Sequence, residues 1–365
     1  MYSMSIKKEV IEKQLSGVIT DASYLKNIQI FGNEIVVDIE IENPTLQYKN
    51  KLEKDCKEAL NKYEANLELK INFIVRASKP TIKGNPIPGV KNIIAVSSGK
   101  GGVGKSTVAA NVAVGLSEKG YKVGLVDADI YGPSVHIMFD LIDGVPESIE
   151  VNGKKKIKPL ESYGVKVLSI GFFTKSNQAV VWRGPMASKA LNQLIWDAHW
   201  GELDFLIVDL PPGTGDIHLS LVQAIPVTGA LIVSTPQNIA LADARKGVQM
   251  FQMDSISVPV LGIIENMSYF SPMELPENKY YIFGKDGAKG LAEEMKVKLL
   301  ASIPIVQSIR EAADAGRPAV LQMETEVGKA FLNLCDNIID SVQARNKNNN
   351  PTESVKVTHN KGCSN

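Results

Sequence analysis

Residues 99–107 read Gly99-Lys100-Gly101-Gly102-Val103-Gly104-Lys105-Ser106-Thr107, and this stretch decides the fold. An apolar run over 92–96 precedes it, and a helical pattern opens at Thr107. A strand, a glycine-rich loop ending in Gly-Lys-Ser and a helix, in this order, predict a phosphate-binding loop. The glycines let backbone N–H groups turn inward around an anion, and the helix directs its positive end toward it. A glycine-rich turn without function is the disfavoured alternative, because it would not need all three parts.

Three side chains of this loop have expected roles. Lys105 should reach the β- and γ-phosphates of ATP, and the Ser106 hydroxyl is placed to bind Mg²⁺. Lys100 follows the first glycine directly, where an ordinary phosphate-binding loop does not need a lysine. A further cation can stabilise the charge that develops during water attack, and a second subunit can supply it. We expect Lys100 to act across a dimer that encloses two ATP molecules; a solvated surface lysine is the alternative.

The composition is that of an ordinary globular protein. Of the 365 residues, 44% are hydrophobic and 22% charged, which is enough apolar material for a sizeable core. The 40 basic and 40 acidic residues balance, so the net charge favours no nucleic-acid partner. No apolar stretch approaches the roughly 20 residues of a membrane helix, and residues 1–10 lack a signal-peptide core. We expect a cytoplasmic protein without stable membrane association.

Local patterns divide the chain into four parts. Residues 1–80 mix helical and strand patterns, including the period-2 run 34–41, and predict a small α/β domain. Residues 81–90 are rich in proline and glycine and predict a stiff linker. Residues 91–342 predict a nucleotide-binding domain. Residues 343–365 are low in apolar content and predict a disordered tail.

The nucleotide-binding part alternates short apolar runs with helical stretches. The runs after the phosphate-binding loop lie at 122–126, 165–170, 205–208, 229–234 and 260–264. Such alternation predicts an α/β fold with a mostly parallel sheet and helices on both faces. Ligands of such sheets bind beyond the carboxyl ends of the strands, where the motifs of this chain fall.

Aspartates follow two of these runs. Asp127 and Asp129 come after the run 122–126, and Asp209 ends the sequence Phe205-Leu206-Ile207-Val208-Asp209. Four apolar residues followed by aspartate are typical of a Walker B strand, so we expect Asp209 in the shell of Mg²⁺. We assign Asp129 a direct role, holding a Mg²⁺-bound water or orienting the attacking one, and Asp127 a supporting role. A cap at a strand–helix turn is the alternative for Asp127 and Asp129.

The loop after Asp209 has the composition of a switch. It reads Pro211-Pro212-Gly213-Thr214-Gly215-Asp216. Its glycines permit movement toward a γ-phosphate and a return when the phosphate leaves. Asp216 either anchors this movement or caps a turn.

These motifs together resemble known families. Residues 99–107 resemble the deviant Walker A motif of the MinD/ParA-type ATPases. Three further blocks are similar to the Mrp/ApbC (Nbp-type) iron–sulfur cluster carrier ATPases, namely Val126-Asp127-Ala128-Asp129-Ile130-Tyr131-Gly132-Pro133-Ser134, Trp182-Arg183-Gly184-Pro185-Met186 and Asp209-Leu210-Pro211-Pro212-Gly213-Thr214-Gly215-Asp216. The resemblance covers residues 90–340, and residues 1–80 resemble the small MIP18-like domain found in front of it.

The resemblance implies a homodimeric ATPase with ATP and Mg²⁺ that carries a [4Fe-4S] cluster. It would pass the cluster to apo iron–sulfur proteins or assembly factors. The resemblance also implies that Lys100 reaches the partner's nucleotide, and that Asn266 of Glu265-Asn266-Met267-Ser268 contacts adenine. An asparagine amide offers the paired donor and acceptor that an adenine edge needs. For Arg183, a phosphate contact and a structural ion pair both stay open.

One part of the family pattern is missing. Members of the family have Cys-x-x-Cys shortly after Asn-Met-Ser, whereas this chain reads Tyr269-Phe270-Ser271-Pro272-Met273-Glu274-Leu275. Iron–sulfur clusters are held by thiolates, so this segment lacks the usual ligands. We expect Cys56 and Cys335 to be core residues, because both lie in helical patterns. Cys363 is the candidate cluster ligand, and an incidental tail cysteine is the alternative.

Two functions of different kinds follow. The first is an ATP-hydrolysing carrier of iron–sulfur clusters. The alternative is an ATP-gated adaptor of the same fold that loads or remodels a client and has no cluster of its own. A positioning ATPase is disfavoured, because the chain does not end in a basic amphipathic helix. A metabolic kinase stays open on the phosphate-binding loop alone, although the switch loop and Lys100 suit water attack better.

Overall fold

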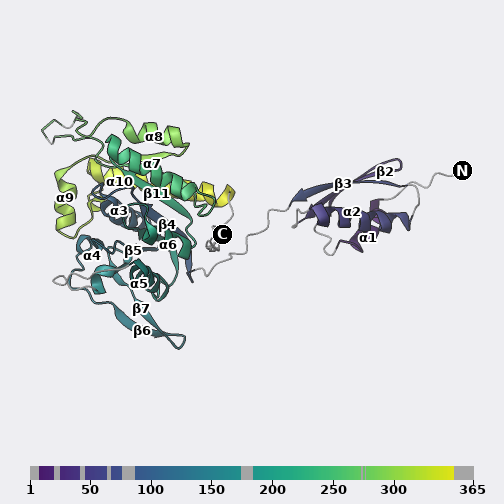
Figure 1. Ribbon diagram of the computed structural model, residues 1–365, viewed down its shortest axis with the longest axis horizontal. Helices are drawn as coiled ribbons and strands as arrows, with labels where there is room; N and C mark the ends of the chain where they lie inside the picture. Colours follow the sequence, from purple (N-terminus) through teal and green to yellow (C-terminus); the bar gives the residue numbers. More distant parts are fainter. Residues whose placement is uncertain are drawn as a thin grey trace, which may run out of the picture. The chain divides into compact units, whose positions relative to one another are not determined.

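The computed structural model describes residues 8–19, 25–41, 46–63, 67–75, 87–173, 184–272, 274–275 and 277–348. The chain folds as two compact units, Met1–Thr81 and Ile82–Asn365 (Figure 1). Each unit has its own hydrophobic core.

The first unit is a three-stranded sheet with two helices, α1 (Lys8–Ser16) and α2 (Leu46–Asn61). Its strands β1 (Leu25–Phe31), β2 (Glu34–Ile41) and β3 (Glu68–Val75) lie in that order. The β1–β2 pair is antiparallel, and the β2–β3 pair is parallel. Alternate residues of β2 are buried, as the period-2 pattern predicted, and they share a core with Ile11 and Leu60.

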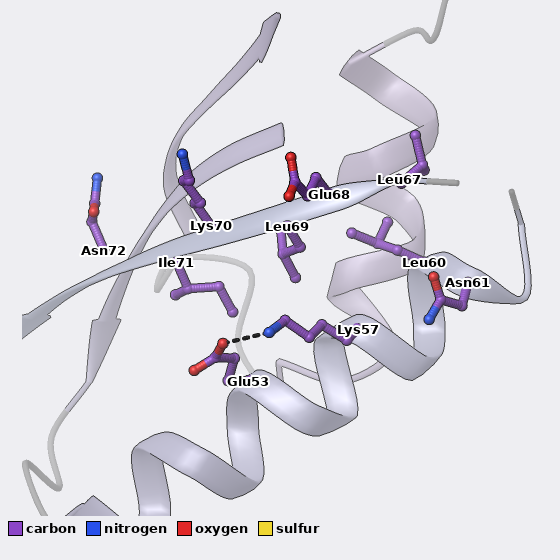
Figure 2. Close-up of a pocket in the computed structure, with 10 residues that line it drawn as sticks. All are labelled: Glu53, Lys57, Leu60, Asn61, Leu67, Glu68, Leu69, Lys70, Ile71 and Asn72. Carbon is purple, nitrogen blue, oxygen red and sulfur yellow. Dashed lines mark hydrogen bonds and ion pairs between the residues drawn. The ribbon is translucent and has the colours of Figure 1, made fainter. Parts of the chain in front are cut away.

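A groove of about 580 Å³ lies between α2 and β3 in this unit. Figure 2 shows Leu69 and Ile71 pointing from the strand toward the helix, and an ion pair between Lys57 and Glu53 on the helix side. The lysine Nζ and the carboxylate Oε1 are 2.6 Å apart. The phosphate-binding loop predicted from the sequence, residues 99–107, lies in the second unit.

The second unit contains an eight-stranded sheet with the order β13-β12-β11-β4-β10-β5-β9-β8. All neighbouring pairs are parallel except β8 with β9. The strands are β4 (Val90–Ser97), β5 (Val123–Asp127), β8 (Leu160–Ser162), β9 (Val165–Ser169), β10 (Leu203–Asp209), β11 (Gly229–Ser234), β12 (Val260–Glu265) and β13 (Leu299–Ser302). The predicted α/β class with a mostly parallel sheet is confirmed.

Helices cover both faces of this sheet (Figure 1). One core joins the sheet to residues of α5 (Gly184–Trp196), α6 (Asp216–Ala224), α7 (Asn238–Gln252) and α8 (Gly287–Met295). The other joins it to α3 (Lys105–Glu118), α4 (Val135–Met138), α9 (Gln307–Asp314), η3 (Ala319–Leu321) and α10 (Glu326–Asn348). The central strands are buried on both faces, which explains their continuous apolar sequences.

Three features depart from the expectations. The hairpin β6 (Glu147–Val151) and β7 (Lys154–Lys158), and the short helix η2 (Ile170–Phe173), were not predicted. The predicted start of the tail at residue 343 is wrong, because α10 continues to Asn348. Its last turns are held by burial: Val342 is 2% exposed and Arg345 is 8% exposed. Among the described helices, none has the length and apolar character needed to span a membrane.

Candidate nucleotide site

The phosphate-binding loop joins the end of β4 to the start of α3. Gly102 and Gly104 have φ angles of 82° and 80°, which lie in the left-handed region. A Cβ atom at Gly104 would lie 2.2 Å from Nδ2 of Asn266. A Cβ atom at Gly99 would lie 2.2 Å from the backbone carbon of Asp243. The motif needs glycine at these positions because the loop turns sharply and other chain segments pack against it.

The sheet order brings the predicted charged residues together. Strand β10 lies between β4 and β5, and Asp209 is in register with Asp127. The Lys105 Nζ lies 2.6 Å from Oδ1 of Asp209 and 3.9 Å from Oδ2 of Asp129. Lys105 is 6% exposed and Asp209 is fully buried. One cation and two carboxylates therefore meet at the carboxyl ends of three adjacent strands.

Asp127 and Asp129 differ in what their carboxylates can still bind. Asp127 is buried and accepts hydrogen bonds from Ser134 N and Val135 N, both at 3.0 Å, and from Ser169 Oγ at 2.9 Å. Burial and the nearby charge of Asp209 raise the pKa of Asp127 to about 7. Asp129 is 14% exposed. Asp127 therefore holds the loop that follows β5, and Asp129 is the carboxylate with access to a ligand.

One of the two carboxylate oxygens of Asp209 has no hydrogen-bond partner among the described residues. Its Oδ1 binds Lys105, whereas Oδ2 is buried without a hydrogen-bond partner among the described residues. Burial raises the pKa of Asp209, and the Lys105 ammonium opposes that rise. A buried, unpaired carboxylate oxygen beside a phosphate-binding loop fits the oxygen preference of Mg²⁺. Ser106 and Asp129 supply the other oxygen groups that would hold the ion.

Asn266 is attached to the phosphate-binding loop. Its side-chain Nδ2 donates to the backbone oxygen of Val103 at 2.9 Å, and its backbone N donates to Ser234 O. The residue is 7% exposed. The NH2 group of the Asn266 side chain is thus hydrogen-bonded to the phosphate-binding loop, at the residue directly before Gly104.

An aromatic segment, residues 269–275, stands where the resemblance predicts a cysteine pair. Glu265 lies just before this segment. Its carboxylate accepts hydrogen bonds from Ser268 Oγ and from the backbone N of Ala288. Tyr269 Oη donates to Glu326 at 2.7 Å, and the Lys279 Nζ lies 4.2 Å from the Tyr269 ring centroid. The described residues of this segment offer a phenol, a hydroxyl and a carboxylate, and they contain no thiol.

The two described cysteines are core residues, as predicted. Cys56 and Cys335 are both 0% exposed. Burial raises the pKa of the Cys56 thiol to about 11 and that of the Cys335 thiol to about 12. Because thiolates are the ligands of metals, these protonated thiols are unsuited to hold a cluster. The other cysteine of the chain, Cys363, lies outside the described residues, as do Trp182 and Arg183.

Two site features stand apart from the cluster around Lys105. Lys100 makes no ion pair with any described residue, and its carbonyl oxygen accepts a hydrogen bond from Ser98 Oγ. His218, which sequence patterns did not single out, is 1% exposed and lies between Ser97 and Pro211. The available signal was a histidine two residues after the loop 211–216, at the start of a helix.

Comparison with known proteins agrees with this geometry. A family model described as the NUBPL iron-transfer P-loop NTPase of the ParA group matches residues 89–339. The chain belongs to this family. A relative from Aquifex aeolicus, named iron-sulfur cluster carrier protein, is 42% identical and aligns with 93% of this chain and 97% of its own. The iron-sulfur cluster transfer protein NUBPL of Dictyostelium discoideum is 43% identical, with 79% of this chain and 88% of its own covered.

Solved structures show the same fold for this NUBPL-type NTPase. A nucleotide-binding protein from Archaeoglobus fulgidus, in complex with ADP, has a TM-score of 0.58 at 36% identity and covers 67% of this chain and 93% of its own. The cell division ATPase MinD of Pyrococcus furiosus has a TM-score of 0.51 at 27% identity and covers 68% of this chain and 98% of its own. The predicted resemblance to carrier ATPases and to MinD-type proteins is confirmed.

The packing at Gly104 generates a testable prediction. Gly104→Ala places a methyl group against Asn266 in a backbone conformation that L-residues avoid, so affinity for ADP should fall by roughly tenfold or more. The matched control is Gly120→Ala, which has a φ of +86° and lies outside the loop, and where a Cβ atom meets nothing within 4 Å. Isothermal titration with Mg²⁺-ADP measures both variants. Equal affinities would show that the close approach to Asn266 does not shape the loop.

Proposed function

We propose that the chain is a homodimeric ATPase that carries iron–sulfur clusters and passes them to apoproteins. The observation that supports the ATPase most strongly is the meeting of Lys105, Asp129 and Asp209 beside the phosphate-binding loop. Relatives at 42% and 43% identity are named cluster carrier and cluster transfer proteins, which supports the cargo.

The residues of the site can perform ATP hydrolysis as follows. Backbone N–H groups of 99–107 and the amino end of α3 bind the phosphates, and Lys105 neutralises the β- and γ-oxygens. Mg²⁺ held by Ser106, Asp129 and Asp209 would offset phosphate charge. A water oxygen attacks the γ-phosphorus, and the bond to the β–γ bridging oxygen breaks to give ADP and phosphate. Because Asp127 is occupied by hydrogen bonds, Asp129 is the carboxylate we assign to orient that water.

Two further residue roles belong to the same proposal. Lys100 acts in the partner's site, where its ammonium stabilises the charge that develops on the γ-phosphate. Asn266 positions the loop before Gly104 and faces the adenine side of the nucleotide. We expect hydrolysis to be slow, because the ATP-bound dimer serves as a gate for cargo rather than as a metabolic catalyst.

The cluster needs thiolates that the described part of the chain does not offer. Cys56 and Cys335 are buried with raised pKa values, so their thiols are excluded on chemical grounds. We therefore assign cluster binding to Cys363, with one thiolate from each copy of the dimer. The alternative, an ATP-gated adaptor without its own cluster, is favoured by the aromatic segment that begins at Tyr269.

Replacing the two lysines of the phosphate-binding loop one at a time should have different effects. Lys105→Ala should abolish ATP hydrolysis, because it removes the buried cation. Lys100→Ala should retain ATP binding, hydrolyse more slowly and shift the ATP-bound protein from dimer toward monomer. Phosphate release and light scattering with ATP measure these effects, and Lys289→Ala is the exposed-lysine control. A wild-type protein that stays monomeric with ATP would contradict the proposed dimer.

The cargo is tested by anaerobic reconstitution with iron and sulfide. The wild type should take up a cluster, and Cys363→Ser should lose it, with Ser364→Ala as the neighbouring control. Iron and sulfide contents are compared after removal of unbound metal. Equal contents in the wild type and Cys363→Ser would reject Cys363 as a ligand. Absence of iron from both would favour the adaptor.

A further inference from the structure

His218 lies where three parts of the NTPase unit meet. Its Nε2 is 3.4 Å from Oγ of Ser97, the last residue of β4. Its Nδ1 is 3.3 Å from the carbonyl oxygen of Pro211, in the loop after Asp209. Its ring packs edge-on against Phe251 of α7, with centroids 5.7 Å apart. The side chain therefore connects the strand that leads into the phosphate-binding loop with the loop that follows the Walker B aspartate.

The partners determine where the protons are. A carbonyl oxygen can only accept, so Nδ1 of His218 carries the hydrogen that bonds to Pro211. Burial and the charge of Lys105 lower the pKa of the ring to about 4, so the ring is neutral at physiological pH. In the neutral ring Nε2 has no hydrogen, and the Ser97 hydroxyl must donate to it. The result is a directed chain of hydrogen bonds from Ser97 to Pro211.

This pair of hydrogen bonds through His218 is one of three links between residues 96–98 and residues 210–213. Leu210 N donates to Val96 O at 3.0 Å, and Gly213 N donates to Ser98 O at 2.9 Å. Between them, Pro211 and Pro212 have no N–H and cannot continue the pattern. His218 supplies the missing link from Ser97 to Pro211. Consecutive residues 96–98 thus hold the loop 210–213 directly before the phosphate-binding loop begins.

We propose that His218 is a positioning residue for ATP hydrolysis, which fixes residues 210–213 so that the exposed Thr214 and Gly215 meet the γ-phosphate side of the site. The inference rests on the proposed ATPase function. It assigns the histidine no contact with the nucleotide. Its loss should therefore slow the hydrolytic step and leave nucleotide affinity almost unchanged.

Two amide variants test the position of the donor. The Nδ2 of asparagine occupies about the place of histidine Nδ1, so His218→Asn keeps the donor to Pro211. The longer His218→Gln carries its amide toward Ser97 instead. His218→Gln and His218→Ala should lower kcat on the order of tenfold, while His218→Asn should retain most of it. The dissociation constant for ADP should stay within about twofold in all three.

A packing control separates positioning from general stability. Phe251→Leu removes the ring contact and leaves both hydrogen-bonding partners of His218 in place, so it should lower Tm without changing kcat. Equal losses of kcat in the Asn and Gln variants would overturn the proposal. So would a loss in Phe251→Leu as large as that in His218→Gln, or a rise in the dissociation constant that parallels the loss of kcat.

Hydrogen exchange keeps this test independent of the ATPase itself. If the wild type does not hydrolyse ATP, the proposed function fails, while the role of His218 in holding the loop is still measurable. The amides of Leu210 and Gly213 should exchange faster in His218→Gln than in His218→Asn. Identical exchange in the two variants would show that the histidine does not hold the loop.

Discussion

The ion pair between Lys105 and Asp209 is the constraint on which the site depends. Burying an ammonium and a carboxylate costs several kcal/mol for each ion, and the cost is offset only by close geometry and further hydrogen bonds. The 2.6 Å contact is possible because β10 lies directly between β4 and β5. The order of the strands thus places a charged pair in a buried position, where electrostatic interactions are stronger than in water.

The end of strand β12 is hydrogen-bonded both to the phosphate-binding loop and to the residues that follow the strand. Asn266 ties the end of β12 to the phosphate-binding loop, and Glu265 beside it ties the same strand end to Ser268 and Ala288. Two adjacent residues therefore join the nucleotide site to the segment that begins at Tyr269.

The sequence predicted the mostly parallel sheet correctly, and it predicted that its motifs fall at the carboxyl ends of the strands, for a physical reason. Strands buried on both faces are continuous apolar runs, and a phosphate-binding loop has glycines at fixed spacing, so both are visible locally. His218 was missed because its partner Ser97 is 121 residues away in the chain and its role exists only after folding. The different roles of Asp127 and Asp129 were predicted, but the reason, the backbone N–H groups at Ser134 and Val135, came from the structure. The end of α10 was misplaced because its polar last turns give no apolar signal, although Arg345 is buried.

The unpaired oxygen of Asp209 gives the most direct test of the nucleotide site. Binding of a slowly hydrolysed ATP analogue is measured by calorimetry with Mg²⁺ and with EDTA, for the wild type and for Asp209→Asn. The wild type should bind more tightly with Mg²⁺, because the ion offsets phosphate charge beside a carboxylate that has an oxygen to spare. The variant should lose this dependence on Mg²⁺ and still bind the analogue in EDTA. An undiminished effect of Mg²⁺ on Asp209→Asn would contradict the assignment of Asp209 to the metal site.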